Sequence, residues 1–326
     1  MGKLDLRGLM AAVAVLAAVA GGASAGDRHA AAHPDLSGLW TSTSLTELQR
    51  PAGLTSPTLS DADAAAYARR HIAEIHAERD NVGGRGSEVD YWNLGDRLAR
   101  IGGHARTSWI VEPADGRLPY SPAGLAARAR ETAAHANADN PESRNVSEQC
   151  LVAGWAAAGP PMMNSPYGDE YQIVQTRDAV AIVMETIHDA RIVRLIARPP
   201  GGDARDPGRH LPASVRPWMG DSVGWWDGAT LVVETTNFNP GDALKLPTDL
   251  YISADARVIE RFSRAGPVDL LYEFTVEDPA TFTRPWRAQM AFQRSKGPMF
   301  EYACHEGNYS LPGILAGARH EEAQAH

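Results

Sequence analysis

The sequence predicts a mainly β protein, an antiparallel meander closed into a lipocalin-like barrel with an α-helical N-terminal portion. Residues Trp218–Phe238 hold two apolar runs joined at Trp226-Asp227-Gly228, and Asp-Gly between apolar runs indicates a hairpin. From about residue 165 onward, short runs rich in β-branched and aromatic residues follow one another without intervening helical patterns. A closed barrel leaves no unpaired strand edge, so we favour it over the alternative, a β-sandwich.

Residues 1–25 have the features of a cleaved signal peptide. Lys3 and Arg7 give a basic start that precedes a short apolar run, and Ala23-Ser24-Ala25 has the small-x-small form of a cleavage site. The run is too short to cross a bilayer of about 30 Å as a helix, although an uncleaved anchor is the alternative. We expect cleavage after Ala25, a periplasmic or secreted protein, no stable membrane insertion, and one domain over residues 26–326.

The formal net charge is -9, which argues against nucleic acid and anionic membranes as partners, because both require clustered Lys and Arg. Only Cys150 and Cys304 occur. In an exported chain an even pair predicts a disulfide, and two separate buried thiols are the alternative. Neither cysteine has the neighbours that a thiolate metal site needs, so we predict no metal there.

The first strand is expected at residues 35–42, where Gly38-Leu39-Trp40 is similar to the Gly-x-Trp of lipocalin-type barrels, whose Trp plugs the barrel floor. Two helical insertions follow, at about residues 60–79 and 122–136. Ser60 with Asp63 makes a start like a capping box, and Ser121 is expected to cap a helix whose first residue is Pro122.

The barrel strands are expected downstream of Tyr167. Two Gly/Pro-rich loops interrupt them, at residues 198–217 and 239–255, and loops of this length in a compact domain are often lids or binding loops. Besides the Trp218 hairpin, the predicted strands cover residues 171–176, 179–186, 191–197, 257–264, 270–277 and 286–294.

Charged residues interrupt the apolar faces of several predicted strands. Trp286, Ala288, Met290 and Phe292 alternate cleanly with polar residues. Glu260 instead shares a face with Val258 and Phe262, and Arg194, Glu234 and Glu185 interrupt other strands in the same way. For each of these residues alone, a solvated, half-buried face is the plainer interpretation. A carboxylate on the lumen side would need a partner or a raised pKa, which is typical of active sites.

The densest polar cluster is Glu185-Thr-Ile-His188-Asp-Ala-Arg191. We predict His188 as the proton-transfer group, Glu185 or Asp221 as its orienting carboxylate and Glu260 as a second acid/base. Arg191 or Arg261 would bind an anionic oxygen. An ordinary turn histidine is the alternative for His188. Glu-x-x-His is a metal-binding spacing on helices, where the two residues share a face, whereas on a strand they point apart, so a metal here is the less favoured alternative.

Gly220-Asp-Ser222-Val-Gly224 matches the Gly-x-Ser-x-Gly nucleophile elbow, which makes a serine esterase one alternative. The elbow requires a helix after the serine, whereas a Trp-rich hairpin is predicted here. Hydrogen bonds from Asp221 and Ser222 to the backbone are the simpler interpretation.

The barrel segment also carries much aromatic surface: Trp225, Trp226, Tyr272, Phe274, Trp286 and Phe292. Core packing explains most such residues. The sharper hypothesis is a pocket for a hydrophobic, aromatic small molecule, in which Trp225, Trp226, Tyr272 and Phe292 contact the ligand.

Several blocks of the sequence resemble a large family of exported bacterial proteins, most of them carried as hypothetical. The resemblance covers nearly the whole chain after the leader and implies export and domain extent, without implying an activity. Trp225 departs from the basic residue expected at its position. The blocks are residues 34–40, 106–117, 171–176, Glu185-x-x-His188-x-x-Arg191, 218–235, Glu260-Arg-Phe262, 275–279 and Pro285-Trp286.

We therefore expect an exported, cofactor-independent enzyme of the lyase, isomerase or dehydratase type, acting on a hydrophobic small molecule. Neither a phosphate-binding Gly-rich loop nor a flavin fingerprint occurs in the sequence. The alternatives are a carrier or sensor of lipophilic ligands, and a structural envelope protein. The sequence does not define the substrate or the oligomeric state.

Overall fold

The computed structural model describes residues 33–82, 95–136, 138–153, 159–165, 170–199, 201, 209–245 and 250–325. The predicted signal peptide at residues 1–25 lies outside these ranges. The fold below belongs to the compact unit Pro34–His326. No helix in the described ranges is both long and apolar enough to cross a bilayer.

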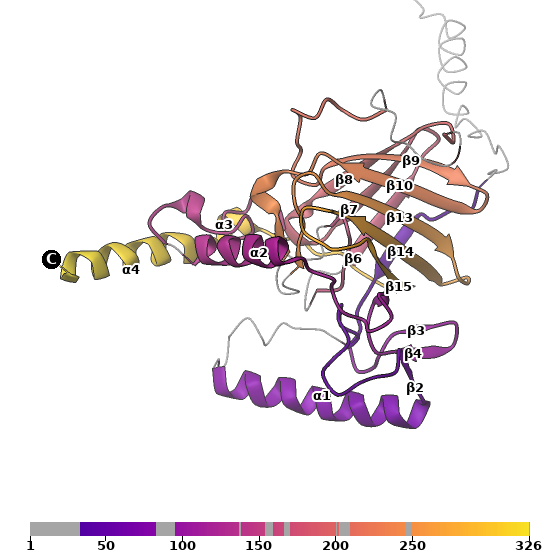
Figure 1. Ribbon diagram of the computed structural model, residues 1–326, viewed down its shortest axis with the longest axis horizontal. Coiled ribbons are helices and arrows are strands. Elements are labelled where there is room, and N and C mark those ends of the chain that lie inside the picture. Colours follow the sequence, from indigo (N-terminus) through magenta and orange to yellow (C-terminus); the bar gives the residue numbers. More distant parts are fainter. Residues whose placement is uncertain are drawn as a thin grey trace, which may run out of the picture. The chain divides into compact units, whose positions relative to one another are not determined.

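Nine of the described strands close into a barrel, because β1 pairs with both β6 and β15. A further strand, β5 (Ile110–Glu112), is added beside β15. The predicted barrel is confirmed, and the sandwich alternative is wrong (Figure 1). In barrel order the strands are β1 (Gly38–Thr41), β6 (Glu170–Gln175), β7 (Ala179–Met184), β8 (Ala190–Leu195), β9 (Asp221–Asp227), β10 (Thr230–Thr236), β13 (Arg257–Arg264), β14 (Asp269–Glu277) and β15 (Trp286–Arg294).

One strand pair departs from the predicted antiparallel meander. β8 and β9 are parallel, with Val193, Arg194 and Leu195 opposite Ser222, Val223 and Gly224. Parallel neighbours cannot be joined by a tight hairpin and need a crossover of a dozen or more residues. The Gly/Pro-rich stretch between β8 and β9 is that crossover, and we call its described residues 209–217 the crossover segment.

The β9–β10 hairpin forms where it was predicted, but its turn lies one residue later. Asp227 pairs with Thr230 as the last strand residue, so Gly228 and Ala229 make the loop. Gly228 has φ +62°. A glycine at positive φ in the first loop position fits a type II′ turn, so Asp-Gly is not the central pair of a type I′ turn.

The two helical insertions are α1 (Asp61–Val82) and α2 (Pro122–His135). Ser60 Oγ accepts a hydrogen bond from the Asp63 N–H at 3.2 Å, and Ser121 Oγ accepts one from the Gly124 N–H at 2.9 Å. Both are the predicted N-caps. Figure 1 shows α1 beside a small sheet of β2 (Thr58–Leu59), β4 (His104–Arg106) and β3 (Arg100–Ile101).

The remaining elements were not predicted. In the described ranges the 3₁₀ turns are η2 (Pro141–Ser143), η4 (Thr186–His188) and η6 (Pro240–Asp242). A two-stranded ladder joins β11 (Leu244–Lys245) to β12 (Leu250–Tyr251). The C-terminal part forms α3 (Cys304–Gly307) and α4 (Ser310–Ala325).

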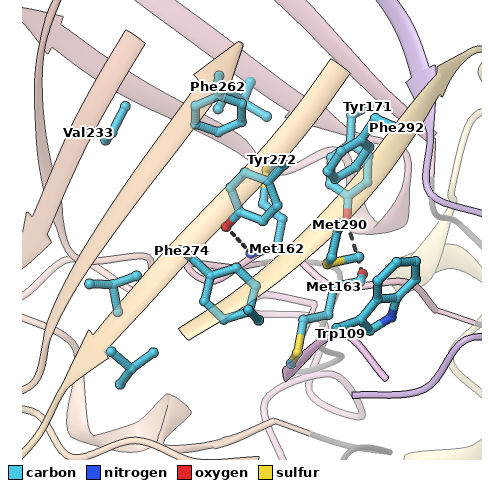
Figure 2. Packing of buried hydrophobic residues seen from close by; sticks show 14 of the residues in the cluster. Trp109, Met162, Met163, Tyr171, Val233, Phe262, Tyr272, Phe274, Met290 and Phe292 are labelled. Carbon is cyan, nitrogen blue, oxygen red and sulfur yellow. Dashed lines mark hydrogen bonds between the residues drawn. The ribbon is translucent and has the colours of Figure 1, made fainter. Parts of the chain in front are cut away.

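Large side chains fill the barrel interior. Strand alternation points Trp286, Met290 and Phe292 inward, and all are at most 2% exposed. The non-strand residues Met162 and Met163 also enter this core: the Met162 N–H donates to Tyr272 Oη at 2.9 Å, and Tyr171 Oη donates to the Met163 carbonyl at 3.1 Å. Figure 2 shows both bonds among the packed rings.

Trp40 of the Gly-x-Trp motif lies on β1, at the closure of the barrel. Its ring is fully buried, and its Nε1–H donates to the Leu36 carbonyl at 3.0 Å. The guanidinium groups of Arg264 and Arg294 lie 5.2 and 4.8 Å from the ring centroid. At these distances cation–π attraction adds to the apolar burial at the closing strand.

The predicted disulfide is confirmed: Cys150 and Cys304 are bonded, across a sequence separation of 154 residues. The bridge joins the loop after η2 to α3. Because it closes a long loop, it restricts the unfolded chain strongly.

Replacing both cysteines, in Cys150→Ser/Cys304→Ser, should lower the free energy of unfolding by about 2–5 kcal/mol through the added entropy of the unfolded chain. Urea unfolding followed by circular dichroism measures the change. Dithiothreitol should destabilise the wild type similarly and leave the double variant unaffected. Equal urea midpoints for wild type and variant would contradict a stabilising bridge.

Candidate functional site

Three of the predicted site residues meet inside the barrel. Arg191 on β8 forms a two-point ion pair with Glu260 on β13, with Nη1–Oε2 at 2.7 Å and Nη2–Oε1 at 2.9 Å. Tyr272 on β14 donates its hydroxyl to Glu260 Oε1 at 2.7 Å. All three side chains are at most 3% exposed. Phe292 completes this wall, with its ring centroid 5.5 Å from that of Tyr272.

The charges of this buried cluster are paired and hydrogen-bonded, but the cluster adds little net stability to the core. Removing two ions from water costs several kcal/mol each, and an apolar pair of equal volume is often as stable. Burial, followed by the neighbouring Glu260 charge, raises the pKa of Tyr272 well above 10, so its hydroxyl keeps its proton. The cluster therefore presents a neutral phenol and a paired carboxylate to the interior.

Asp221 lies on the outer face of the barrel, whereas Glu260 points into the interior. Its Oδ2 accepts from His210 Nδ1 and from the Leu211 N–H, both at 2.8 Å, and its Oδ1 accepts from Arg194 Nη2 at 3.0 Å. His210 Nε2 lies 3.3 Å from Oε1 of Glu234 on β10. His210 thus bridges two carboxylates.

Two arginines flank this bridge, Arg194 at Asp221 and Arg257 at Glu234. Burial alone would raise the pKa of Asp221, but hydrogen bonds from Leu211, His210 and Arg194 outweigh it and hold the pKa below its ordinary value. The pKa of Glu234 is lowered in the same way, by His210 and Arg257 against the effect of burial. Burial would lower the pKa of His210, yet its bonds to Glu234 and Asp221 raise it.

The outer face of β9 and β10 also carries a small apolar cluster, separate from the barrel interior. Val223, Trp225 and Val232 are buried there and pack with Ile196 and Ile259. Trp225 is 1% exposed, so it is a core residue of this outer layer and does not face the lumen. Trp225 therefore lies outside the barrel interior, and its role as a ligand contact stays a prediction.

Glu185 and His188 lie at the connection between β7 and β8. Glu185 Oε1 accepts from the Phe300 N–H at 2.7 Å, and His188 Nδ1 accepts from the Tyr302 N–H at 3.2 Å. The two side chains bind the C-terminal segment before α3. Glu185 thus has a backbone partner in place of the predicted orienting role, and neither residue joins the Glu260 cluster.

Arg261 and Trp226, two further residues predicted to contact the ligand, lie apart from the Glu260 cluster. Arg261 points to the outer face and pairs with Asp227 at 3.3 Å. Trp226 is half-buried and packs against the main core. The predicted set is thus divided among the interior, the outer face and one end of the barrel.

Ser222, the serine of the Gly-x-Ser-x-Gly match, lies within β9 and is 3% exposed. Its Oγ is 2.8 Å from Thr235 Oγ1 on the inward face of β10. The chain continues into a hairpin, so the strand-to-helix turn that exposes a nucleophilic serine is absent here.

A cleft of about 320 Å³ opens in the barrel wall where β8 starts before its pairing with β9. Residues 189–192 line one side and residues 217–222 line the other. The parallel ladder begins only at Val193 and Ser222, so the first half of β8 lacks β9 as a neighbour. Arg191 of the interior cluster and Asp221 of the outer bridge both border this cleft.

The cleft also contains Asp189, whose Oδ2 accepts from the Ala153 N–H at 3.0 Å. Burial, and then the charge of Asp242, raises the pKa of Asp189. Asp189 and Asp221 therefore have pKa values displaced in opposite directions at one cleft. Such a divergence separates a proton donor from an ionised partner.

Sequence reasoning missed His210 and Asp189. His210 lies in an aperiodic Gly/Pro-rich stretch, so no strand pattern gives its side chain a direction. Asp189 lies within the stretch that was singled out, between His188 and Arg191, and only its burial distinguishes it. In the part of the chain that the structure describes, no group of three or more His, Cys, Asp or Glu side chains is arranged to hold a metal ion.

Comparisons with protein-family models, curated proteins and solved structures gave no match.

Glu260→Gln should destabilise the protein by about 3–5 kcal/mol, because it leaves the Arg191 guanidinium buried without its counter-charge. The double variant Arg191→Met/Glu260→Leu, which removes both charges, should lose less. Urea denaturation of the two variants gives the comparison. Glu273→Gln on the outer face of β14 serves as a control. A double variant less stable than Glu260→Gln would contradict this account.

Proposed function

We propose that this protein is an exported enzyme that carries out acid–base chemistry, of the lyase, isomerase or dehydratase type, on a small molecule with a flat apolar part. The reacting site is the cleft between the start of β8 and the approach to β9. The observation that carries the proposal is the pair of carboxylates there, Asp189 and Asp221, with pKa values displaced in opposite directions.

The composition of the cleft supports this substrate class. Its volume of about 320 Å³ falls in the lower range of ligand pockets, which are about 300–1,000 Å³. Trp218, Met219, Pro217 and Ile192 contribute apolar surface, while the two carboxylates supply a few polar groups. Pockets of this kind bind apolar ligands and orient them through a small number of polar contacts.

In this mechanism Asp189 carries the proton to be donated, and ionised Asp221 accepts a proton or stabilises positive charge. His210 and Arg194 hold the Asp221 carboxylate in place. The Arg191–Glu260–Tyr272 cluster lies behind the cleft and fixes the position of β8. Glu260 thereby becomes a positioning residue in the proposal, and His188 and Glu185 belong to the attachment of the C-terminal segment.

The alternative is a carrier of lipophilic ligands. The carboxylate of Glu260 and both carboxylate oxygens of Asp221 have hydrogen-bond partners. This pairing favours a carrier, since paired carboxylates transfer protons poorly. A carrier binds its ligand equally well with both cleft carboxylates removed, whereas an enzyme binds and loses turnover.

Asp189→Asn and Asp221→Asn should each slow proton exchange by about 10²–10⁴-fold, the usual contribution of a general acid or base. The mature protein, starting at residue 26, is incubated in D₂O with a panel of small aromatic ketones, and deuterium uptake at carbon is measured by mass spectrometry.

Asp178→Asn, an exposed aspartate on the turn between β6 and β7, is the matched control and should exchange like the wild type. Circular dichroism at the assay temperature shows that each variant is folded. Binding without exchange in the wild type would favour the carrier. Exchange that persists in both cleft variants would remove the site assignment.

A further inference from the structure

His210 lies between two carboxylates that come from neighbouring strands. Its Nδ1 faces Asp221 Oδ2 at 2.8 Å, and its Nε2 faces Glu234 Oε1 at 3.3 Å. Ionised carboxylates only accept hydrogen bonds, so both ring nitrogens must donate. Only the imidazolium has two N–H groups, and a neutral imidazole would turn a lone pair toward one of the carboxylates.

The same histidine attaches the crossover segment to the barrel. The next residue, Leu211, donates its N–H to Asp221 and accepts from Asn237 Nδ2 at 2.9 Å. Among the residues that the structure describes, the other charged groups facing His210 are Arg194 of β8 and Arg257 of β13, one beside each carboxylate. Both arginines remain charged over the whole physiological range, so His210 is the group in this network that titrates near neutrality.

We propose that His210 is a proton-operated latch that fastens the crossover segment across the outer face of β9 and β10. Protonated, it closes both carboxylate contacts and holds the segment. Deprotonated, it loses one contact and the start of the segment, around Leu211, opens from the barrel, while Arg216 still holds the end of the segment by pairing with Asp255 at 2.8 Å. The latch is a property of the fold and stands whether or not the cleft is catalytic, although Asp221 links it to the cleft rim.

The pH dependence of the latch follows from the coupling between folding and proton binding at His210. The pKa of His210 in the folded state is raised above its ordinary value of 6.5. A raised folded pKa contributes stability that is complete below the unfolded pKa and is lost as the pH rises through the folded pKa. The latch is therefore closed in acid solution and opens as the pH rises through the raised pKa of His210 in the folded state.

Hydrogen exchange of the Leu211 amide tests the latch, with rates corrected for the intrinsic pH dependence of exchange. In the full mature protein, its protection factor should fall at least tenfold between pH 6 and pH 10. His210→Gln should show low protection at both pH values. His104→Gln, at an exposed histidine of β4, should behave like the wild type.

Glu234→Gln gives the opposite expectation and separates the latch from simple unfolding. With an amide at position 234, neutral His210 can donate to Asp221 and accept from the glutamine, so protection should persist at pH 10. Arg257 keeps its second partner, Glu277, at 2.9 Å. Equal alkaline loss in Glu234→Gln and wild type, or pH-independent protection in the wild type, would overturn the proposal.

Discussion

The parallel pairing of β8 with β9 determines the arrangement of the whole functional region. Antiparallel strands could have been joined by a short turn, whereas this pair requires a long crossover. The crossover brings His210 to the outer face of β9 and β10. The short ladder, which begins only at Val193, leaves the start of β8 open and forms the cleft. One topological constraint thus produces both the opening and the segment beside it.

The charged cluster behind the cleft has a different origin. Arg191, Glu260 and Tyr272 lie in the buried interior, where the Tyr272 ring contacts the rings of Phe262, Phe274 and Phe292. Replacing such a pair with apolar residues is often neutral for stability, so burial energy alone does not account for its presence. The two-point Arg191–Glu260 contact also links β8 to β13 across the interior, since these strands are separated in barrel order by β9 and β10. Arg191 thus connects the part of β8 that lines the cleft to the opposite strand β13.

Local patterns predicted the strands well because period-two alternation is a property of each strand alone. Glu260, Val258 and Phe262 were expected on one face, and they do share the interior. The pairing between strands was harder to predict: the long loop predicted at residues 198–217 permits a parallel crossover but does not require one. His210 could not be found for the same reason, since its role arises from the crossover. Glu185 and His188 were grouped with Glu260 by sequence pattern, but the tertiary fold places them at the C-terminal segment.

The two ionic networks lie on opposite faces of the same strands, and this arrangement fixes the strand register. In β13, Glu260 points inward while Arg257 points outward to Glu234 of β10. A slip of one residue would reverse both directions at once, because successive side chains alternate between faces. Glu260 would lose its ion pair with Arg191, and a charged side chain that now lies on the outer face would enter the apolar interior without a partner. Such a slip would cost far more than a lost apolar contact. Charges on both faces therefore specify a single register, and with it the alignment of Asp221 and Glu234 on which the His210 bridge depends.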